Sequence, residues 1–210
     1  MMHNPWDIRY RKDKDFFGDE IDHEIQCIID NLPKGSSVLD AGCGLGRNGL
    51  YLLKRGYNIY FLDYSQEALT RVKQHNPKSK TILSDLTNLP FRNESFDSVI
   101  AMHVLHCIPN KERKAVKEFY RILKNDGMII AKARSVKDSD YGRGILIGDN
   151  TYLKEDGLSI HFFEPEEYLS LFEDLFYIDN FQQEEVLDRS HGEPHTHNFL
   201  SIIARKKKCL

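Results

Sequence analysis

The sequence predicts an α/β fold in which a mostly parallel sheet is covered by helices on both faces. Short apolar runs rich in β-branched residues alternate along the chain with stretches whose apolar residues recur every three or four positions, which is the pattern of strand-helix-strand units. The links between these stretches are short, as crossover units prefer. A length of 210 residues, of which 40% are hydrophobic, suits one well-filled core, so we expect residues 1–210 to form a single domain.

The chain up to residue 132 is expected to contain four helices and five strands. The first helix is predicted over residues 19–32, because its apolar residues share one face and Pro33 and Gly35 follow it. Strands are expected at residues 37–39, 58–62, 81–83, 98–101 and 128–132, with helices between them at 47–55, 66–74 and 111–124. Ser65 is the expected N-cap of the helix that begins at residue 66. The turn at residues 125–127 is expected to close the helix before it.

The last third of the chain breaks this alternation. Residues 134–161 have no sustained period, so we expect residues 134–175 to form a variable segment that covers the substrate. A helix is expected to start at Glu164-Pro165, with proline in its first turn. Two strands, at residues 176–187 and 199–205, complete the domain. Their connection is about a dozen residues without a helix, so they should form an antiparallel hairpin.

A glycine-rich turn follows the first predicted strand, in the stretch VLDAGCGLGRNGLYL. Gly42, Gly44 and Gly46 let the backbone approach a ligand, and the free amides at the next helix start can bind its polar groups. Such a turn also suits the pyrophosphate of NAD, so a dinucleotide-dependent oxidoreductase is the competing interpretation. Asp40 argues against it, because an unpaired carboxylate would repel a pyrophosphate. An acid here suits a cationic ligand such as S-adenosylmethionine, which has a sulfonium and no phosphate.

Two more acids end the next two predicted strands. Asp63 lies where a carboxylate can accept hydrogen bonds from both ribose hydroxyls. Asp85 can accept from the exocyclic amine of adenine, while the amide of Leu86 serves a ring nitrogen. Each acid taken alone is explained as well by a turn or a helix cap. Acids at three successive strand ends favour a nucleoside site.

These stretches resemble the successive motifs of the class I S-adenosylmethionine-dependent methyltransferases over nearly the whole chain. The motifs are LDAGCGLG, LDYS, SDLTNLPFRNESFDSVIAMHVLHCI and EFYRILKNDGMII. The resemblance implies a Rossmann-like seven-stranded sheet with an antiparallel last strand, S-adenosyl-L-methionine as cofactor and S-adenosyl-L-homocysteine as product. It also implies a set of cofactor-binding residues: Asp40, the glycines Gly42, Gly44 and Gly46 for the methionine part, Asp63 and Tyr64 for the ribose, Asp85 and Leu86 for the adenine, and Met102 and His103 beside the cofactor.

The segments WDIRYRKDKDFFGDE and GRNGLYLLKRGY resemble those of tellurite-resistance and thiopurine S-methyltransferases. We therefore expect methyl transfer to a small, soft thiol or chalcogen acceptor. The alternatives are O- or N-methylation of a larger metabolite or of a modified RNA base. Outside this class, two alternatives stay open: a NAD-dependent oxidoreductase and a non-catalytic nucleoside-binding module.

The acceptor is expected at the rim formed by the loops after strands four, five and six, because ligands of open α/β sheets lie outside the carboxyl ends of the strands. Residues 1–18 are expected to fold over the cofactor as a lid. Candidate bases or orienting residues are His103, His106 and His195, and candidate rim residues are Trp6, Tyr10, Arg134, Tyr141, His191 and His197.

Each of these residues also has a plainer interpretation. His106 is more often structural in a VLHCI context, Trp6 can seal the domain edge, and Arg134 can pair with a surface acid. The HGEPHTH stretch is a possible metal site, but no cysteine or acid pattern completes a familiar ligand set, so no metal is expected.

Composition limits the partners. The formal net charge is -3, so there is no global positive field of the kind that binds nucleic acid, and nucleic acid is not the expected partner. A basic stripe within residues 111–124 is interpreted as a solvated helix face. No apolar run approaches the ~20 residues of a membrane span. Four scattered cysteines and no secretory leader indicate a cytoplasmic protein, monomeric or homodimeric.

Overall fold

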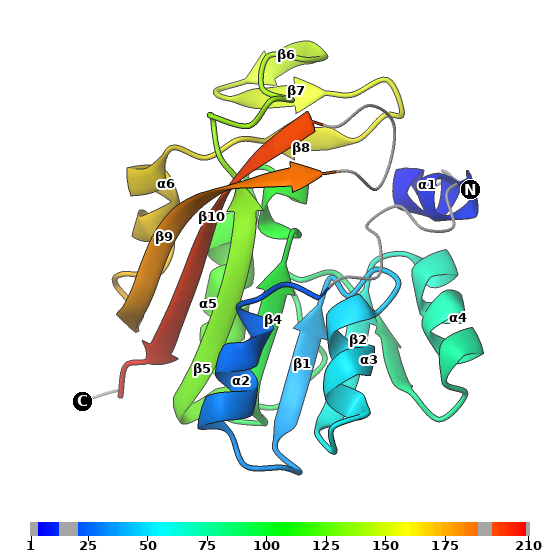
Figure 1. Cartoon of the computed structure of the whole chain (residues 1–210), viewed down its shortest axis with the longest axis vertical. Helices are drawn as coiled ribbons and strands as arrows, with labels where there is room; N and C mark the ends of the chain where they lie inside the picture. The colour runs from blue at the N-terminus through cyan, green and yellow to red at the C-terminus, as the bar shows by residue number, and fades with distance from the viewer. Residues whose placement is uncertain (1–3, 13–20, 189–194, 209–210) are drawn as a thin grey trace.

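The central feature is a seven-stranded sheet with the order β3-β2-β1-β4-β5-β10-β9 (Figure 1). A computed structural model describes residues 4–12, 21–188 and 195–208. Strands β1 to β5 are parallel to one another, and β10 is antiparallel to both β5 and β9, which confirms the predicted hairpin and the antiparallel last strand. The bounds are β1 (Ser37–Ala41), β2 (Asn58–Asp63), β3 (Lys80–Leu83), β4 (Phe96–Met102), β5 (Leu123–Arg134), β9 (Phe176–Asp188) and β10 (His195–Lys206).

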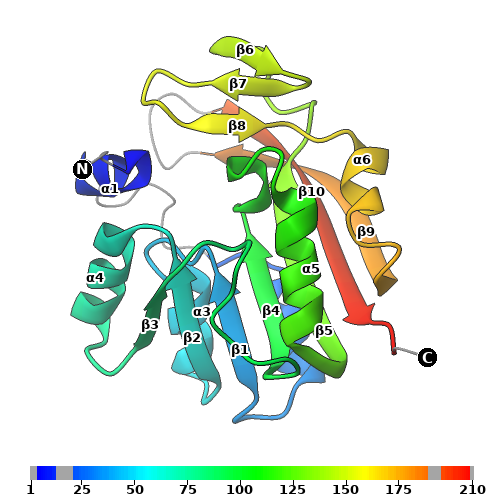
Figure 2. The same cartoon turned by 180° about the vertical axis from the view of Figure 1, so that it is seen from behind.

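Helices cover both faces of this sheet, as Figures 1 and 2 show from opposite sides. Side chains alternate along a strand, so neighbouring residues enter different cores: Val38 joins the cluster under α2, α3 and α4, and Leu39 joins the cluster under α5 and α6. The helices are α1 (Pro5–Lys12), α2 (Ile25–Asn31), α3 (Arg47–Leu53), α4 (Gln66–His75), α5 (Glu112–Ile122) and α6 (Pro165–Ser170), with a 3-10 turn η1 (Leu105–Cys107). None of the described helices is long and apolar enough to cross a membrane.

The predicted starts of α4 and α6 are confirmed, with the expected capping residues. The Ser65 hydroxyl accepts from the amide of Ala68 at 3.2 Å, as expected of an N-cap. Pro165 is the first residue of α6, and the N-cap residue Glu164 forms a reciprocal capping box with Glu167 in the first turn of the helix.

Several helix ends differ from the prediction by a residue or more, and for two of them the contacts show why. The helix expected over residues 19–32 begins at Ile25, because Asp22 is turned toward α3 and its amide donates to the Asn48 side chain at 3.2 Å; residues 13–20 lie outside the described part. The helix expected to reach residue 124 ends at Ile122, and β5 starts at once, because Leu123 already pairs with Phe96 of β4.

Residues 134–161, in which the sequence shows no sustained period, contain strands that the sequence did not predict. This segment contains a three-stranded antiparallel sheet of β6 (Ile145–Gly148), β7 (Thr151–Leu153) and β8 (Ser159–His161). Strands of three or four residues are too short to show a period in the sequence. Tyr152, Ile160 and Phe162 form a small core of their own, against which Trp6 packs. In Figure 1 this sheet lies above the carboxyl ends of β1 and β4.

Candidate functional site

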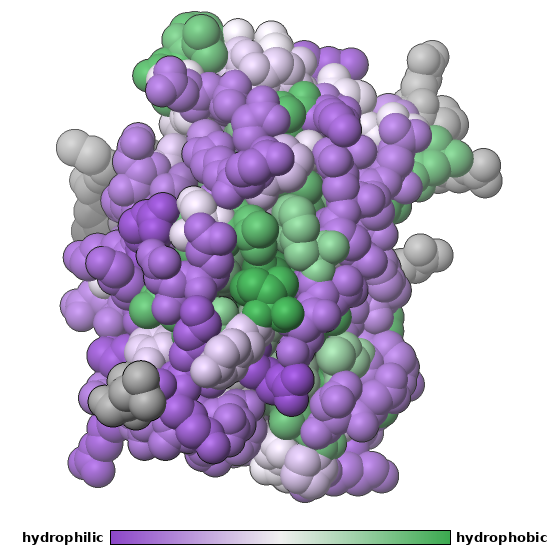
Figure 3. Space-filling view, turned by 90° about the vertical axis from the view of Figure 1, so that its left-hand side faces the viewer, coloured by the Kyte–Doolittle hydropathy of each residue, from purple (hydrophilic) through white to green (hydrophobic). Residues whose placement is uncertain are grey.

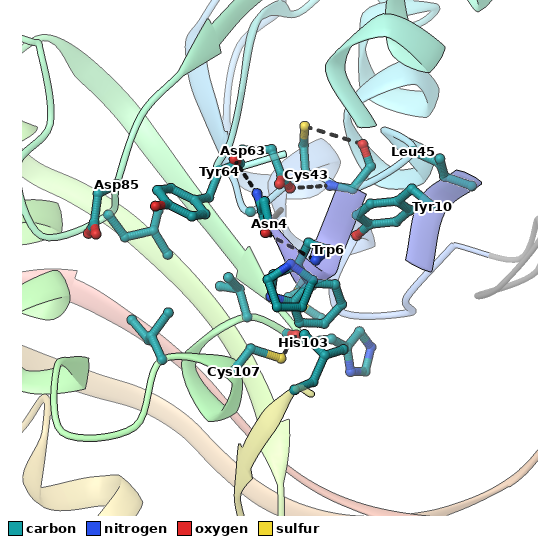
Figure 4. A pocket seen from close by; sticks show the side chains of 18 of the residues that line it. Asn4, Trp6, Tyr10, Cys43, Leu45, Asp63, Tyr64, Asp85, His103 and Cys107 are labelled. Carbon is teal, nitrogen blue, oxygen red and sulfur yellow. Dashed lines mark hydrogen bonds between the residues drawn. The ribbon is translucent and has the colours of Figure 1, made fainter. Parts of the chain in front are cut away.

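A cavity of about 440 Å³ lies at the carboxyl ends of β1, β2 and β4, within the size range of small-molecule sites (Figure 4). The lining includes nine of the ten residues that the resemblance assigns to the cofactor, namely Asp40, Gly42, Gly44, Asp63, Tyr64, Asp85, Leu86, Met102 and His103. Trp6 and Tyr10 of the expected lid also line it. The structure therefore brings together acids from three strand ends, the glycine-rich turn and α1.

The glycine-rich turn forms a wall of bare backbone. Gly42 has φ +71°, and a Cβ on it would lie 2.3 Å from a methyl of Val104. A Cβ on Gly44 would lie 2.8 Å from the hydroxyl oxygen of Tyr10. Neither position has room for a side chain. Gly46 is outside the lining given by the described residues; it is the N-cap of α3 at φ +80° and faces Phe61 and Val72 of the core.

Asp63 ties this turn to the second strand. Its carboxylate accepts from the amides of Gly44 and Ser65, both at 2.8 Å. Burial raises the pKa of Asp63 to about 6, although these amides oppose the rise. A carboxylate offers about four lone pairs, so two amide bonds leave capacity for hydroxyl donors. Figure 4 shows Asp63 between the turn and Tyr64.

Asp40 is paired, contrary to the premise of the sequence argument. Its carboxylate accepts from the amide of Gly49 at 3.0 Å, and so ties β1 to α3. Burial raises the pKa of Asp40 to about 7, with the nearby Asp63 adding to the rise. Within the described residues neither acid forms a salt bridge to a lysine or arginine. This end of the cavity thus holds two desolvated acids that no lysine or arginine of the described chain pairs in a salt bridge.

The adenine end of the cavity is more open. Asp85 accepts from the amide of Thr87 at 2.8 Å, which is also the turn geometry that the plainer interpretation describes. Its side chain is 40% exposed and lies 3.8 Å from the Lys111 ammonium. Burial raises the pKa of Asp85, but the bonds from Thr87 and the charge of Lys111 outweigh burial and lower the pKa overall.

Helix α1 is fixed over the cavity at three places. The Asn4 side chain donates to the carbonyl of Tyr64 at 2.9 Å (Figure 4). Asp7 accepts from the Ser65 hydroxyl at 2.6 Å, at the start of α4. Arg9 pairs with Asp156 in the turn between β7 and β8. These contacts hold Trp6 and Tyr10 against the cavity, between α4 and the small sheet.

His103 follows β4 at φ +58°, a strained conformation for a residue with a side chain. Its Nε2 lies 2.9 Å from the Asp22 carboxylate. Asp22 also bonds to Arg47 at 2.7 Å and to the Asn48 amide nitrogen at 2.9 Å. Burial raises the pKa of Asp22, but His103, Arg47 and Lys132 outweigh it and hold the pKa below its usual range. Asp22 therefore carries a fixed negative charge against the His103 ring.

The other histidines that the structure describes lie outside the cavity lining. His106 is buried, which holds its imidazole pKa well below the ordinary value of 6.5, and no described residue bonds to its Nδ1. The His197 Nδ1 lies 3.1 Å from an Asp138 oxygen, and the His195 and His197 rings are adjacent. His191 lies outside the described residues.

Arg134 lies beside Asp138 and His197 and is the cation of this cluster. Its guanidinium bonds to Asp138 at 3.3 Å and to Asp140 at 2.5 Å. Asp138, Asp140 and His197 have the spacing of metal ligands, but the guanidinium already bonds to both carboxylates where a metal ion would bind them. Tyr141, also expected at the rim, donates to the Asn150 side chain at 2.8 Å. None of Arg134, Tyr141 and His197 reaches the cavity lining given by the described residues.

Sequence reasoning missed several lining or supporting residues. Asp22 was assigned to a helix, and nothing in its neighbourhood pointed to a site. Cys107 and Leu158 line the cavity from η1 and from the turn before β8. The contact of α1 with Asp156 depends on the small sheet that the sequence did not reveal.

Comparisons with known proteins agree with this geometry. Residues 39–131 match the family model of the methyltransferase domain. A crystal structure of an S-adenosylmethionine-dependent methyltransferase from Methanosarcina mazei superimposes with a TM-score of 0.73 and 25% identity, over 86% of this chain and 96% of that one. The chain is a class I S-adenosylmethionine-dependent methyltransferase. Its cofactor is S-adenosylmethionine, and the oxidoreductase alternative is set aside.

Relatives of this methyltransferase include enzymes of RNA. Mouse METTL6, a tRNA N(3)-cytidine methyltransferase, is 28% identical over 89% of this chain and 74% of its own length. Human METTL2B, of the same description, is 27% identical over 71% of this chain and 44% of its own length. TehB from Haemophilus influenzae shares the fold, with a TM-score of 0.71 at 19% identity, over 96% of this chain and 67% of that one.

Proposed function

We propose that this methyltransferase acts on a small acceptor whose reacting heteroatom carries an ionisable proton, with thiols and other chalcogens as the first choice. The observation that carries the proposal is the Asp22-His103 pair at the cavity, where the carboxylate fixes one ring nitrogen and leaves the other to accept a proton. A solvated surface histidine would have neither a buried partner nor a strained backbone.

The residues at the strand ends fit the cofactor. Gly42 and Gly44 present bare backbone in the cavity lining, and the charges of Asp40 and Asp63, to which no described lysine or arginine forms a salt bridge, suit a cation rather than a phosphate. Asp63 would hold the ribose, and Asp85 with Leu86 the adenine. When bound, S-adenosylmethionine supplies a methyl group on a positively charged sulfur, which is already activated for displacement.

The chain's part in the reaction is mainly to orient two partners and to exclude water. The backbone wall and Trp6 confine the cavity, and residues 157–159 close it from the small sheet. Correct orientation can lower a barrier by ~7–11 kcal/mol in favourable cases. We propose that residues 1–18 act as the lid of a single domain and that residues 134–175 act as its cover.

His103 supplies the acid-base chemistry. The Asp22 carboxylate accepts from Nε2–H, so Nδ1 is the nitrogen that receives the acceptor's proton. A thiol with an ordinary pKa near ~8.5 is only a few per cent ionised at neutral pH, so a base beside it increases the thiolate fraction. The apolar and sulfur-bearing lining from Trp6, Val104 and Cys107 favours a soft acceptor over a strongly hydrated one.

The test measures S-adenosylhomocysteine release with a panel of thiols, selenite, tellurite, phenols and amines. We expect a thiol or chalcogen to be methylated and His103→Asn to lower kcat about tenfold or more. Asp22→Asn should lower kcat less than His103→Asn does, because the carboxylate orients the ring and does not receive the proton, with cofactor affinity kept within about threefold. Equal turnover by wild type and His103→Asn at every pH would remove His103 as the base.

A base of tRNA is the second candidate acceptor. It is favoured by the likeness to METTL6, which extends over 89% of this chain, and it weighs against our expectation from net charge that nucleic acid is not the partner. Unmodified tRNA transcripts belong in the same panel, with N3-methylcytidine detected by mass spectrometry after digestion. Methylated tRNA with no turnover of thiols or chalcogens would replace the first proposal with the second.

A further inference from the structure

Strand β6 is an edge strand with three consecutive exposed apolar side chains. Ile145, Leu146 and Ile147 are 67%, 63% and 51% exposed. In the described part of the chain β6 pairs only with β7, so its other edge has unpaired backbone groups. Figure 3 shows apolar surface at the top of the molecule, at the height of β6 in Figure 1. An apolar edge of this kind is a ready template for pairing with another strand.

The sequence around β6 is self-complementary about Leu146. In the stretch RGILIGD, an antiparallel pair centred on that residue places each residue opposite one of matching character. The facing residues are Leu146 with Leu146, Ile145 with Ile147, Gly144 with Gly148, and Arg143 with Asp149. The apolar residues thus meet apolar residues, the glycines meet at both ends, and the two charges at each end are opposite.

We propose that β6 pairs with β6 of a second copy of this chain to form a twofold-symmetric dimer. Twofold symmetry applies the same contacts twice, so both ends gain an Arg143-Asp149 pair and the two small sheets become one continuous sheet. Arg143 is already 3.3 Å from Asp140, but its side chain is 68% exposed, and such surface pairs exchange readily. The order of charges on the two sides of Leu146 is complementary to itself, which favours a second copy of this chain over a different protein.

The bulge in β6 is compatible with this pairing. The register with β7 shifts between Leu146 and Gly148, which bends the strand at Ile147. Arg143 lies two residues before β6 and Asp149 directly follows it, and the long Arg143 side chain reaches beyond a directly opposite position, so the two can meet across such a bend. Neither residue lines the cofactor cavity.

The test uses charge exchange and light scattering of the purified full chain. Wild type should elute with a mass near twice 24.5 kDa. Arg143→Asp and Asp149→Arg should each be monomeric, because each places like charges opposite one another at both ends. An equimolar mixture of the two variants should form a heterodimer, since every facing pair is then opposite in charge. The double variant R143D/D149R should dimerise again on its own.

These variants also control for folding. Both positions are exposed, so far-UV circular dichroism should be unchanged in all of them, and Leu146→Lys should give a folded monomer because two lysines would face each other at the axis. A monomeric wild type overturns the proposal, and β6 would then be a pairing site for a different protein. A dimer that persists in both single variants, or a mixture of them that stays monomeric, overturns it as well.

Discussion

Two groups of buried carboxylates at the carboxyl edge of the sheet are stabilised in different ways. At the β1-β2 end, Asp40 and Asp63 accept from backbone amides, and burial raises their pKa values to about 7 and about 6. At the β5-β10 end, Asp138 is bonded to His197 and Arg134, which lower its pKa although burial opposes them. The first group retains negative charge that a cationic ligand can neutralise. In the second group the carboxylate is already bonded to side chains of the chain itself, so this group stabilises the fold.

The largest effect should come from the second group. Asp138→Ala removes the shared acceptor of the Arg134 guanidinium, the His197 ring and the Asn198 amide, and leaves Arg134 with Asp140 alone, so the free energy of unfolding should fall by about 3–5 kcal/mol. Urea denaturation at neutral pH measures it. Because the pKa of Asp138 is lowered, this contribution is present above its ordinary value of 3.8 and is lost as pH falls below that value. Cofactor affinity should stay within about threefold; a larger loss would contradict the division into two groups.

Asp63→Ala tests the first group. The substitution removes the acceptor of the Gly44 and Ser65 amides and the expected partner of the ribose. The binding free energy of S-adenosylhomocysteine should therefore weaken by about 1–3 kcal/mol, and its Kd should rise roughly tenfold for each ~1.4 kcal/mol. Isothermal titration calorimetry measures it. Asp97→Ala is the matched control, because Asp97 also accepts from a backbone amide, that of Ser37, but outside the cavity. Equal Kd values for the two variants would mean that Asp63 is not at the ribose.

The sequence located the first group because the information there is local. Asp63 ends a strand, and the glycines of the turn follow Asp40 within a few positions, so spacing alone places them at one edge of a parallel sheet. The interpretation of Asp40 was incomplete, since its partner is the Gly49 amide, which becomes a neighbour only when α3 packs on β1.

The second group could not be found in this way. Asp138 meets His197 across 59 positions of the chain, and Asp22 meets His103 across 81 positions. Contacts at such separations depend on the packing of whole elements. Strands β6 to β8 were missed for a different reason, because three or four residues do not establish a period.

Asp40→Asn should stabilise the unliganded protein. The folded pKa of Asp40, about 7, is raised above the ordinary 3.8, so the folded state binds more protons and loses stability as pH rises between these values. Asparagine keeps an oxygen for the Gly49 amide and carries no charge. We expect a gain on the order of 1–2 kcal/mol at about pH 8 and no gain at about pH 4, measured by urea denaturation at both pH values. An equal gain in stability at both pH values would mean that the gain does not come from removing the charge of Asp40.

The smallest effect separates cofactor from product. S-adenosylmethionine carries a positive sulfur that S-adenosylhomocysteine lacks, and Asp40 and Asp63 become charged between about pH 5 and about pH 8, as their pKa values of about 7 and about 6 require. The ratio of the two Kd values should therefore shift several-fold toward S-adenosylmethionine over this range, by about 1 kcal/mol. Ligand groups common to both molecules cancel in the ratio, which isolates the sulfur. In Asp40→Asn the shift should shrink, because only Asp63 then titrates beside the ligand; an undiminished shift would place the sulfonium nearer to Asp63 than to Asp40.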